Sequence, residues 1–238
     1  MPLSEPPERQ LEWCFLGRVP YRIANDLQGR LRERLRRREG REVLLLLEHS
    51  HVYTLGRNAS REDILVDREW LRSHDATVFE SDRGGKVTYH GPGQLVGYPI
   101  IDLNPDRRDI RRYVRDLQEM LVLVLGDLGI NAVPGTRSEE IGVWVGERKI
   151  ASIGVHISRW ITTHGFALNV NTDLSYFRAI IACGLQGLEM TSLETVTGTR
   201  LSLTEISLAC ARHFAEIFQR RAVEVKPASL CDPWPIAS

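Results

Sequence analysis

Three short segments combine residue types that can bind or attack a carbonyl group. The first places a glycine pair between two cations, the second starts with a lysine followed by small residues, and the third sets a cysteine beside a glycine. They read Arg83-Gly84-Gly85-Lys86-Val87-Thr88-Tyr89-His90, Lys149-Ile150-Ala151-Ser152-Ile153-Gly154 and Ala182-Cys183-Gly184. If the fold joins them in one pocket, they predict nucleophilic chemistry on a thiol.

Cys183 is the candidate nucleophile. It follows an apolar helix and precedes Gly184, so substrate can approach it and its backbone N–H can face a developing oxyanion. A free thiol has a pKa of about 8.5 and reacts as the thiolate, which a neighbouring cation stabilises. Lys149 is the candidate cation, because it is one of few lysines in a chain whose bases are mostly arginine. The alternative for Lys149 is an exposed lysine at a hairpin end, the usual position for this residue type.

The segment from Arg83 to His90 has the features of a ligand-binding turn. Gly84 and Gly85 remove side chains where backbone N–H groups could face a ligand, and Arg83 can offer a planar fork to a carboxylate, phosphate or carbonyl. His90 stands at a strand end, where catalytic and binding groups are common. A tight turn and a hydrogen-bonded core histidine are the structural alternatives.

The remaining cysteines and histidines give no second site. Cys14, Cys210 and Cys231 lack a glycine-flanked setting, and the four cysteines form no C-x-x-C pair, which argues against a disulfide scaffold and a zinc site. His49 and His51 share one face of a strand, but no third ligand of matching character lies nearby. We therefore expect no metal and no cofactor.

Composition excludes several other classes of protein. The 238 residues (27.1 kDa) carry 31 basic and 31 acidic side chains, a balance that argues against a nucleic-acid-binding surface. No apolar run approaches the roughly 20 residues that cross a bilayer, and the first ten residues lack a signal-peptide core, so we expect a cytoplasmic protein without membrane contact. The arginines from Arg30 to Arg38 predict a solvated helix face, or alternatively a docking patch for an acidic protein.

Periodicity and turn residues predict mixed secondary structure. Helices are expected over 21–38, 67–73, 109–128, 174–181 and 202–220, and strands over 11–16, 43–48, within 77–102 and within 141–170. Helices and strands do not alternate strictly, which predicts a mixed α/β (α+β) fold with at least one antiparallel sheet. We expect a disordered segment over 1–10, a single domain over 11–221 and an irregular tail over 222–238.

Taken together, these segments resemble the signature blocks of the lipoyl(octanoyl) transferases. The resemblance spans residues 43–194 in the order of the family, which is far more specific than one motif. Two departures stand out: Ala182 replaces the usual proline before the cysteine, and a proline-containing turn is absent around His49 and His51. The matching blocks are Glu48 with Val52-Tyr53-Thr54-Leu55-Gly56-Arg57, Arg83-Gly84-Gly85, Thr88-Tyr89-His90, Gly93-Gln94, Tyr98, the Lys149 segment, His164-Gly165-Phe166-Ala167-Leu168-Asn169-Val170, Asp173 and Cys183-Gly184.

The resemblance implies both a fold and a reaction. The fold is that of biotin protein ligases and lipoate ligases, with a central mixed β-sheet flanked by helices. Cys183, paired with Lys149, would take an octanoyl group from octanoyl-acyl carrier protein as a thioester. It would then pass the group to a lysine of lipoyl domains, in the E2 subunits of 2-oxoacid dehydrogenases and in the glycine cleavage H protein. Either Lys149 or His90 would accept the proton of the incoming amine.

The same resemblance assigns the pocket and leaves two alternatives for the function. The acyl pocket would be lined by Arg83 to His90, by Ser152, Ile153 and Gly154, and by Gly165, Phe166 and Ala167. One alternative is an ATP-dependent lipoate or biotin-type ligase, although the GRGRxG-type adenylate loop of biotin ligases is absent. The other is a non-catalytic lipoyl-domain binding module, which would need no cation beside a thiol.

Overall fold

The fold is described by a computed structural model that covers residues 9–137, 140–185 and 187–230, apart from the side chain of Cys183. The strands are β1 (Arg9–Arg18), β2 (Glu42–Glu48), β3 (Val52–Leu55), β4 (Thr77–Glu80), β5 (Val87–His90), β6 (Gln94–Ile100), β7 (Val133–Pro134), β8 (Gly142–Val145), β9 (Arg148–Ser158), β10 (Ile161–Asn169) and β11 (Arg220–Glu224). The α-helices are α1 (Tyr21–Arg36), α2 (Arg68–Ser73), α3 (Ile110–Gly126), α4 (Leu193–Thr197) and α5 (Leu203–Phe218). Short 3₁₀ helices are η1 (Arg61–Asp63), η3 (Leu174–Ala179), η4 (Ala182–Gly184) and η5 (Pro227–Ser229).

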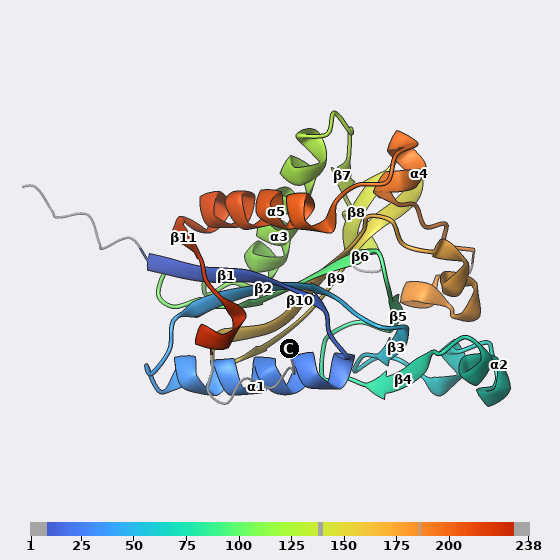
Figure 1. The fold of residues 1–238 in the computed structure, drawn as a ribbon, viewed down its shortest axis with the longest axis horizontal. Helices are drawn as coiled ribbons and strands as arrows, with labels where there is room; N and C mark the ends of the chain where they lie inside the picture. The colour runs from blue at the N-terminus through green and yellow to red at the C-terminus, as the bar shows by residue number, and fades with distance from the viewer. Residues whose placement is uncertain (1–8, 138–139, 186, 231–238) are drawn as a thin grey trace, which may run out of the picture.

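Eight strands form the central sheet, in the order β11-β1-β2-β6-β10-β9-β8-β7. β1 pairs in parallel with β11 and β2, and the other neighbours are antiparallel. The sheet is therefore mixed and carries helices on both faces (Figure 1). This arrangement confirms the fold class predicted from the sequence.

β2 explains why both faces of the sheet need cover. Its side chains are buried from Glu42 to Leu47, and they alternate between two hydrophobic clusters because successive residues of a strand point to opposite faces. Leu44 and Leu46 pack in the cluster that includes α3 and α5, whereas Val43, Leu45 and Leu47 pack in the cluster that includes α1. In Figure 1, α1 lies below the sheet and α3 and α5 lie above it.

A second, three-stranded sheet lies beside one end of the central sheet, in the order β4-β3-β5 (Figure 1). Its apolar cluster includes Tyr53, Val87 and Tyr89, and residues of η3 and η4 such as Phe177 and Ala182 complete it. This small cluster therefore fixes the chain on both sides of Cys183 against β5.

Most predicted elements are confirmed, with shifts at their ends. The expected helix over 174–181 is the 3₁₀ helix η3, which starts where the Asp173 side chain accepts from the N–H of Ser175. The structure also places strand β11 at Arg220–Glu224, across the boundary expected at residue 221, because the left-handed Gln219 (φ 53°) ends α5 and turns the chain toward β1. Of the expected terminal segments, residues 1–8 and 231–238 lie outside the described part of the chain.

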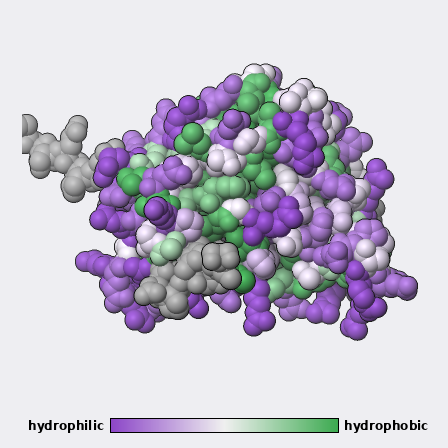
Figure 2. Space-filling view, viewed as in Figure 1, coloured by the Kyte–Doolittle hydropathy of each residue, from purple (hydrophilic) through white to green (hydrophobic). Residues whose placement is uncertain are grey.

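Polar residues cover most of the face seen in Figure 2, with apolar residues showing between them. No described helix combines the length and apolar character that crossing a bilayer requires. On α1, Glu33 forms ion pairs with Arg36 at 2.6 Å and with Arg37 at 2.8 Å. Local pairing of this kind is typical of a solvated helix face, while a docking role for Arg30 to Arg38 stays a prediction.

Candidate active site

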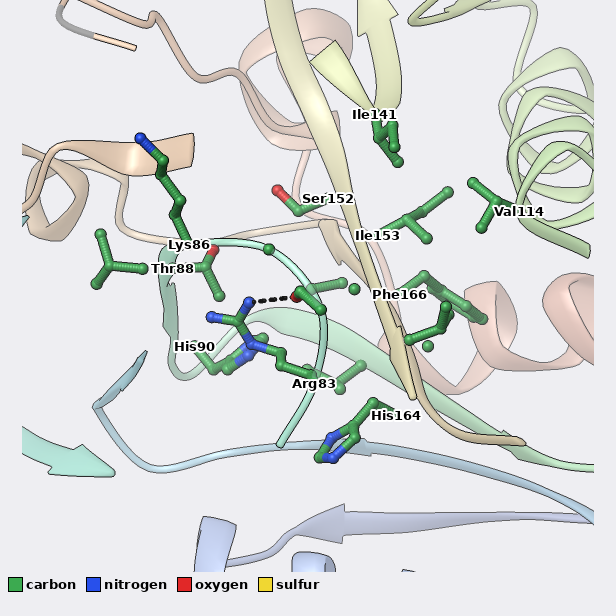
Figure 3. Close-up of a pocket in the computed structure, with 18 of the residues that line it drawn as sticks. Arg83, Lys86, Thr88, His90, Val114, Ile141, Ser152, Ile153, His164 and Phe166 are labelled. Carbon is green, nitrogen blue, oxygen red and sulfur yellow. Dashed lines mark hydrogen bonds between the residues drawn. The ribbon is translucent and has the colours of Figure 1, made fainter. Parts of the chain in front are cut away.

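A cavity of about 620 Å³ opens between the central sheet, the loop before β5 and the start of α3. Most residues predicted for the site line it, and Figure 3 shows them converging from several elements. Tyr89 is not among the lining residues. Those that line it are Arg83, Gly84, Gly85, Lys86, Val87, Thr88, His90, Lys149, Ser152, Ile153, Gly154, Gly165, Phe166 and Ala167.

Strand register places the Lys149 segment opposite the block His164-Gly165-Phe166-Ala167. In the antiparallel pair β9 and β10, Ser152 lies opposite Ala167, Ile153 opposite Phe166 and Gly154 opposite Gly165. The glycines of β10 and β6 are required by close packing between these two strands. A Cβ on Gly165 would come within 2.3 Å of the Gly97 carbonyl oxygen, and one on Gly97 within 2.1 Å of the Phe166 ring. Glycine therefore allows β10 and β6 to approach each other and leaves room for the Phe166 ring against β6.

The Arg83 turn is tied to both sheets. The Gly84 N–H donates to the Val155 carbonyl of β9 at 2.9 Å. Arg83 is buried, and its guanidinium donates to the Thr54 carbonyl at 2.6 Å, to the Thr54 hydroxyl at 2.9 Å and to the Gly84 carbonyl at 3.0 Å. Figure 3 draws the last of these bonds. Arg83 thus holds the glycine turn in place at the cavity wall, in addition to the ligand contact predicted for it.

Lys149 is buried inside the cavity wall rather than exposed at the hairpin end, with only 1% of its surface accessible. Its backbone accepts from the Thr191 N–H and donates to the Glu189 carbonyl, both at 2.9 Å. Its Nζ lies 5.6 Å from the centroid of the Trp144 ring, within the range of a cation–π contact. A buried lysine of this kind argues for a role in the cavity, because lysines are almost never buried without a partner or function.

Gly142 makes the space that the Lys149 side chain occupies. It adopts φ 145°, and a Cβ there would lie 2.5 Å from the Lys149 Cε and 2.3 Å from the Ala151 carbonyl oxygen. We expect Gly142→Ala to lower the free energy of unfolding by roughly 1–3 kcal/mol. It should also reduce activity, because the side chain of Lys149 must move. Denaturant unfolding and a transfer assay measure the two effects.

Gly146 provides the matched control for Gly142. It also has a positive φ (59°), in the turn of the same β8–β9 hairpin, but a Cβ there would meet nothing within 4 Å. Gly146→Ala should therefore cost stability and keep activity near that of the wild type. Equal activity of the two variants would argue against a functional position for Lys149.

Cys183 is the middle residue of η4. The next residue, Gly184, has φ 70° and lines the cavity together with Leu185. The side chain of Cys183 itself lies outside the described part of the structure. The Lys86 side chain packs against this turn. A Cβ on Gly184 would lie only 2.2 Å from the Lys86 Nζ, so a side chain at position 184 would displace the lysine. The backbone next to Cys183 and the buried Lys149 therefore share one cavity, while the role of each side chain stays a prediction.

Tyr89 points away from the cavity, on the face of β5 opposite to that of Thr88 and His90. Its hydroxyl lies 2.8 Å from the His51 Nδ1, and its ring stacks on Tyr176 at 5.0 Å. His49 turns to the other side, with Nδ1 at 2.6 Å from the Val19 carbonyl oxygen and Nε2 at 2.8 Å from the Tyr98 hydroxyl. The two histidines thus serve different hydrogen-bond networks. Within the described part of the chain, no group of His, Cys, Asp and Glu residues is arranged to hold a metal ion.

A carboxylate with two histidines borders the cavity on the α1 side. Asp82 accepts from His164 at 2.7 Å and lies 2.6 Å from the His156 Nδ1. The hydrogen bond from His164 holds the pKa of Asp82 well below its usual value. His164 has φ 56°, and its backbone N–H donates to the Gln28 side chain at 2.6 Å, so the local backbone is held in place by contacts from α1.

Sequence reasoning missed the far wall of the cavity. This wall includes Ile110 and Val114 of α3 and Ile141 before β8. Figure 3 shows Val114 and Ile141 across from Lys86 and Thr88. The sequence did contain a signal for this wall. Ile110 and Val114 form an i, i+4 apolar pair that lies outside the main buried stripe of α3, and Ile110 is 51% exposed. Other lining residues absent from the prediction are Tyr21, Asn58, Val96, Tyr98, Val155, His164, Gly184 and Leu185.

Comparisons with known proteins cover almost the whole chain. Residues 20–215 match the family model described as "Lipoyl protein ligase A/B catalytic domain". An octanoyltransferase of Solibacter usitatus is 51% identical over 203 residues, which cover 85% of this chain and 90% of that protein. An octanoyltransferase of Caldicellulosiruptor bescii is 43% identical over 206 residues, covering 86% of this chain and 90% of that protein.

The fold is also shared with a solved structure. A chain from an archaeal lipoylation system, a bi-partite lipoate protein ligase and its E2 lipoyl domain from Thermoplasma acidophilum, aligns with a TM-score of 0.69 and 21% identity. The alignment covers 92% of this chain and 88% of that chain. At this identity the likeness establishes a common fold.

Proposed function

The chain belongs to the lipoyl protein ligase A/B catalytic domain family and is similar over most of its length to octanoyltransferases, and on that premise we propose how it transfers an octanoyl group in protein lipoylation. Family membership confirms the resemblance inferred from the motifs. Octanoyl transfer is an acyltransferase reaction. The proposal concerns the residues and partners: Cys183 carries the acyl group as a thioester, and Lys149 stabilises its thiolate.

The observation that carries this proposal is the composition of the cavity. Its lining includes the cation Lys149 and Gly184, the neighbour of Cys183, together with the apolar residues Val114, Ile141 and Phe166. An acyl thioester needs both kinds of lining, because its carbonyl carbon reacts at the thiol while its aliphatic chain requires apolar contacts. A charge buried as deeply as Lys149 acts more strongly on a neighbouring anion than an exposed one.

In the first half-reaction, the Cys183 thiolate attacks the carbonyl carbon of an octanoyl thioester. A C–S bond to Cys183 forms while the carbonyl π electrons move to oxygen. When they return, the bond to the donor sulfur breaks, and the donor leaves as a thiolate that takes a proton from the medium. The backbone N–H of Cys183 is the candidate donor to the transient oxyanion, because the Gly184 N–H already donates to the Ile181 carbonyl at 3.0 Å.

In the second half-reaction, the amine of an acceptor lysine attacks the octanoyl-Cys183 thioester. A C–N bond forms, the C–S bond breaks, and Cys183 leaves as the thiolate that Lys149 stabilises. The amine must lose one proton to a base in the cavity. Conversion of a thioester into an amide is downhill, so the reaction needs no ATP, and two successive half-reactions predict ping-pong kinetics.

The donor in this proposal is octanoyl-acyl carrier protein. The acceptors are lipoyl domains, in the E2 subunits of 2-oxoacid dehydrogenases and in the glycine cleavage H protein. One relative by fold comes from a system that includes an E2 lipoyl domain, which supports an acceptor of this class.

Intact-mass spectrometry after mixing the protein with octanoyl-acyl carrier protein tests the proposal. We expect an octanoyl adduct on Cys183 without ATP, and its loss when a lipoyl domain is added. Transfer that requires ATP and survives Cys183→Ser would instead indicate a ligase. Binding of the lipoyl domain without any adduct or transfer would indicate a non-catalytic binding module.

A further inference from the structure

A buried chain of hydrogen bonds leads from the cavity to the strand that carries Lys149. The His90 Nδ1 lies 2.7 Å from the Gln94 Oε1, and the Gln94 Nε2 donates to the Asn169 Oδ1 at 2.9 Å. The Asn169 Nδ2 donates to the Thr191 carbonyl at 3.0 Å, and the Thr191 N–H donates to the Lys149 carbonyl at 2.9 Å. His90, Gln94, Asn169 and Thr191 are all less than 9% exposed.

Two backbone carbonyls fix the direction of every bond in this chain. The Gln94 amide also faces the Tyr89 carbonyl oxygen at 3.2 Å, and a carbonyl oxygen can only accept. The group facing Tyr89 must therefore be the NH₂ of Gln94, which leaves its oxygen toward His90. In the same way, the Thr191 carbonyl orients Asn169, whose oxygen then accepts from Gln94.

The orientation of Gln94 decides the tautomer of His90. Because the Gln94 oxygen accepts, the His90 Nδ1 must carry the hydrogen. A neutral imidazole protonated on Nδ1 keeps its lone pair on Nε2. This Nε2 makes no hydrogen bond to any residue that the structure describes. The ring lines the cavity on the same side as Lys86 and Thr88 (Figure 3).

The other histidines near the cavity are arranged differently. His164 uses Nε2 to bind Asp82, and its Nδ1 is fully buried, where substrate cannot reach it. The His49 Nδ1 must donate to the Val19 carbonyl, so its Nε2 accepts from the Tyr98 hydroxyl and its lone pair is used. Lys149, for its part, must remain a cation to stabilise the leaving thiolate of Cys183.

The surroundings of His90 keep its ring neutral. Burial lowers the pKa of His90 well below its usual value, and the nearby His49, Arg83 and His164 lower it further, against the opposing effect of the hydrogen bond that His90 donates to Gln94. The pKa of His49 falls to about 4 through burial. A neutral His90 at physiological pH has its Nε2 available as a base.

We propose that His90 is the base that accepts the proton of the acceptor amine, with Gln94 and Asn169 as positioning residues. The assignment rests on the octanoyl-Cys183 route of the proposed function. As the C–N bond forms, the nitrogen becomes positively charged and its proton passes to the His90 Nε2. The C–S bond then breaks, the Cys183 thiolate and the amide separate, and His90 returns the proton to water.

Separate measurement of the two half-reactions tests this role. Octanoyl-enzyme is formed with octanoyl-acyl carrier protein, and its decay on adding lipoyl domain is followed by intact mass. His90→Asn keeps a donor for Gln94 but has no basic nitrogen. We expect it to form the adduct at a rate near that of the wild type and to pass the octanoyl group on about 10²-fold more slowly or worse. Imidazole should restore part of the lost rate in His90→Ala.

Gln94→Leu and His49→Asn separate a positioning effect from a structural one. Gln94→Leu should slow the amine step selectively, because the His90 tautomer is no longer fixed. His49→Asn, which removes a buried histidine whose ring centroid is 5.7 Å from that of His90, should leave the ratio of the two rates unchanged.

Three results would overturn the assignment, and the last is distinguishable from the first two. Equal slowing of both half-reactions in His90→Asn, or an unchanged amine step, would reject His90 as the base while the thioester route stands. A wild-type protein that forms no octanoyl adduct on Cys183 would reject the route itself, and with it any role for His90 in the amine step.

Discussion

Replacing Cys183 by alanine should abolish octanoyl transfer while the fold remains intact. Without the thiol there is no acceptor for the acyl group, because η4 offers no second nucleophile that could carry it. Loss of a covalent nucleophile typically lowers turnover by roughly 10³-fold or more. Transfer of octanoate to a lipoyl domain, measured by mass, gives the rate, and thermal unfolding checks the fold.

Cys210 provides the matched control for Cys183. It is fully buried in α5, and burial raises its pKa to about 12, so it is neither accessible nor ionised at neutral pH. Cys210→Ala should retain transfer at some cost in stability. Activity of Cys183→Ala close to that of the wild type would eliminate Cys183 as the carrier.

Removing the charge of Lys149 should have the second largest effect. In Lys149→Met, the thiolate of Cys183 loses its buried counter-ion, and the pH midpoint of iodoacetamide labelling should rise by about 1–3 units. Transfer at neutral pH should fall accordingly, because less thiolate is present. Labelling followed against pH, with adduct position assigned by mass, measures the midpoint directly.

The other cysteines do not obscure this experiment. Cys14 and Cys210 are buried, and burial raises the pKa of each to about 12, so native protein should label slowly at both. Cys231 lies outside the described residues, and a Cys231→Ser background removes it from the measurement.

Lys86 gives the informative comparison. Its Nζ lies against Gly184, yet the residue is exposed, whereas Lys149 is 1% exposed. Water screens an exposed charge more strongly, so Lys86→Met should shift the labelling midpoint less than Lys149→Met. A larger shift for Lys86, or none for Lys149, would transfer the counter-ion role to Lys86.

Local pattern was sufficient for the elements of the fold. The apolar run of β2, the amphipathic stripe of α3 and the glycine turns around β5 each predicted an element that the structure confirms. These signals are local because they depend on which side of a strand or helix is buried. Pairing of Arg220–Glu224 with β1 was not predicted, since a partner 211 residues away leaves no local trace in a short polar strand.

The candidate site divides in the same way. Its motifs and their order in the sequence indicated an acyl transferase. Alternation along β5 would have separated Tyr89 from Thr88 and His90, although Val87, on the same face as Tyr89, still lines the cavity at the start of the strand. The anchoring of Arg83 to Thr54 could not be predicted, because it depends on where β3 lies next to the turn.

Residue types and local patterns therefore identify the side chains that are chemically able to carry an acyl group and the segments that form strands and helices. The three-dimensional arrangement shows in addition that Lys149 is buried in the same cavity as the Gly184 turn, that α3 closes its apolar wall, and that Gln94 and Asn169 orient His90. Each of these features depends on contacts between segments that are far apart in the chain. Residue type and local spacing do not specify those contacts.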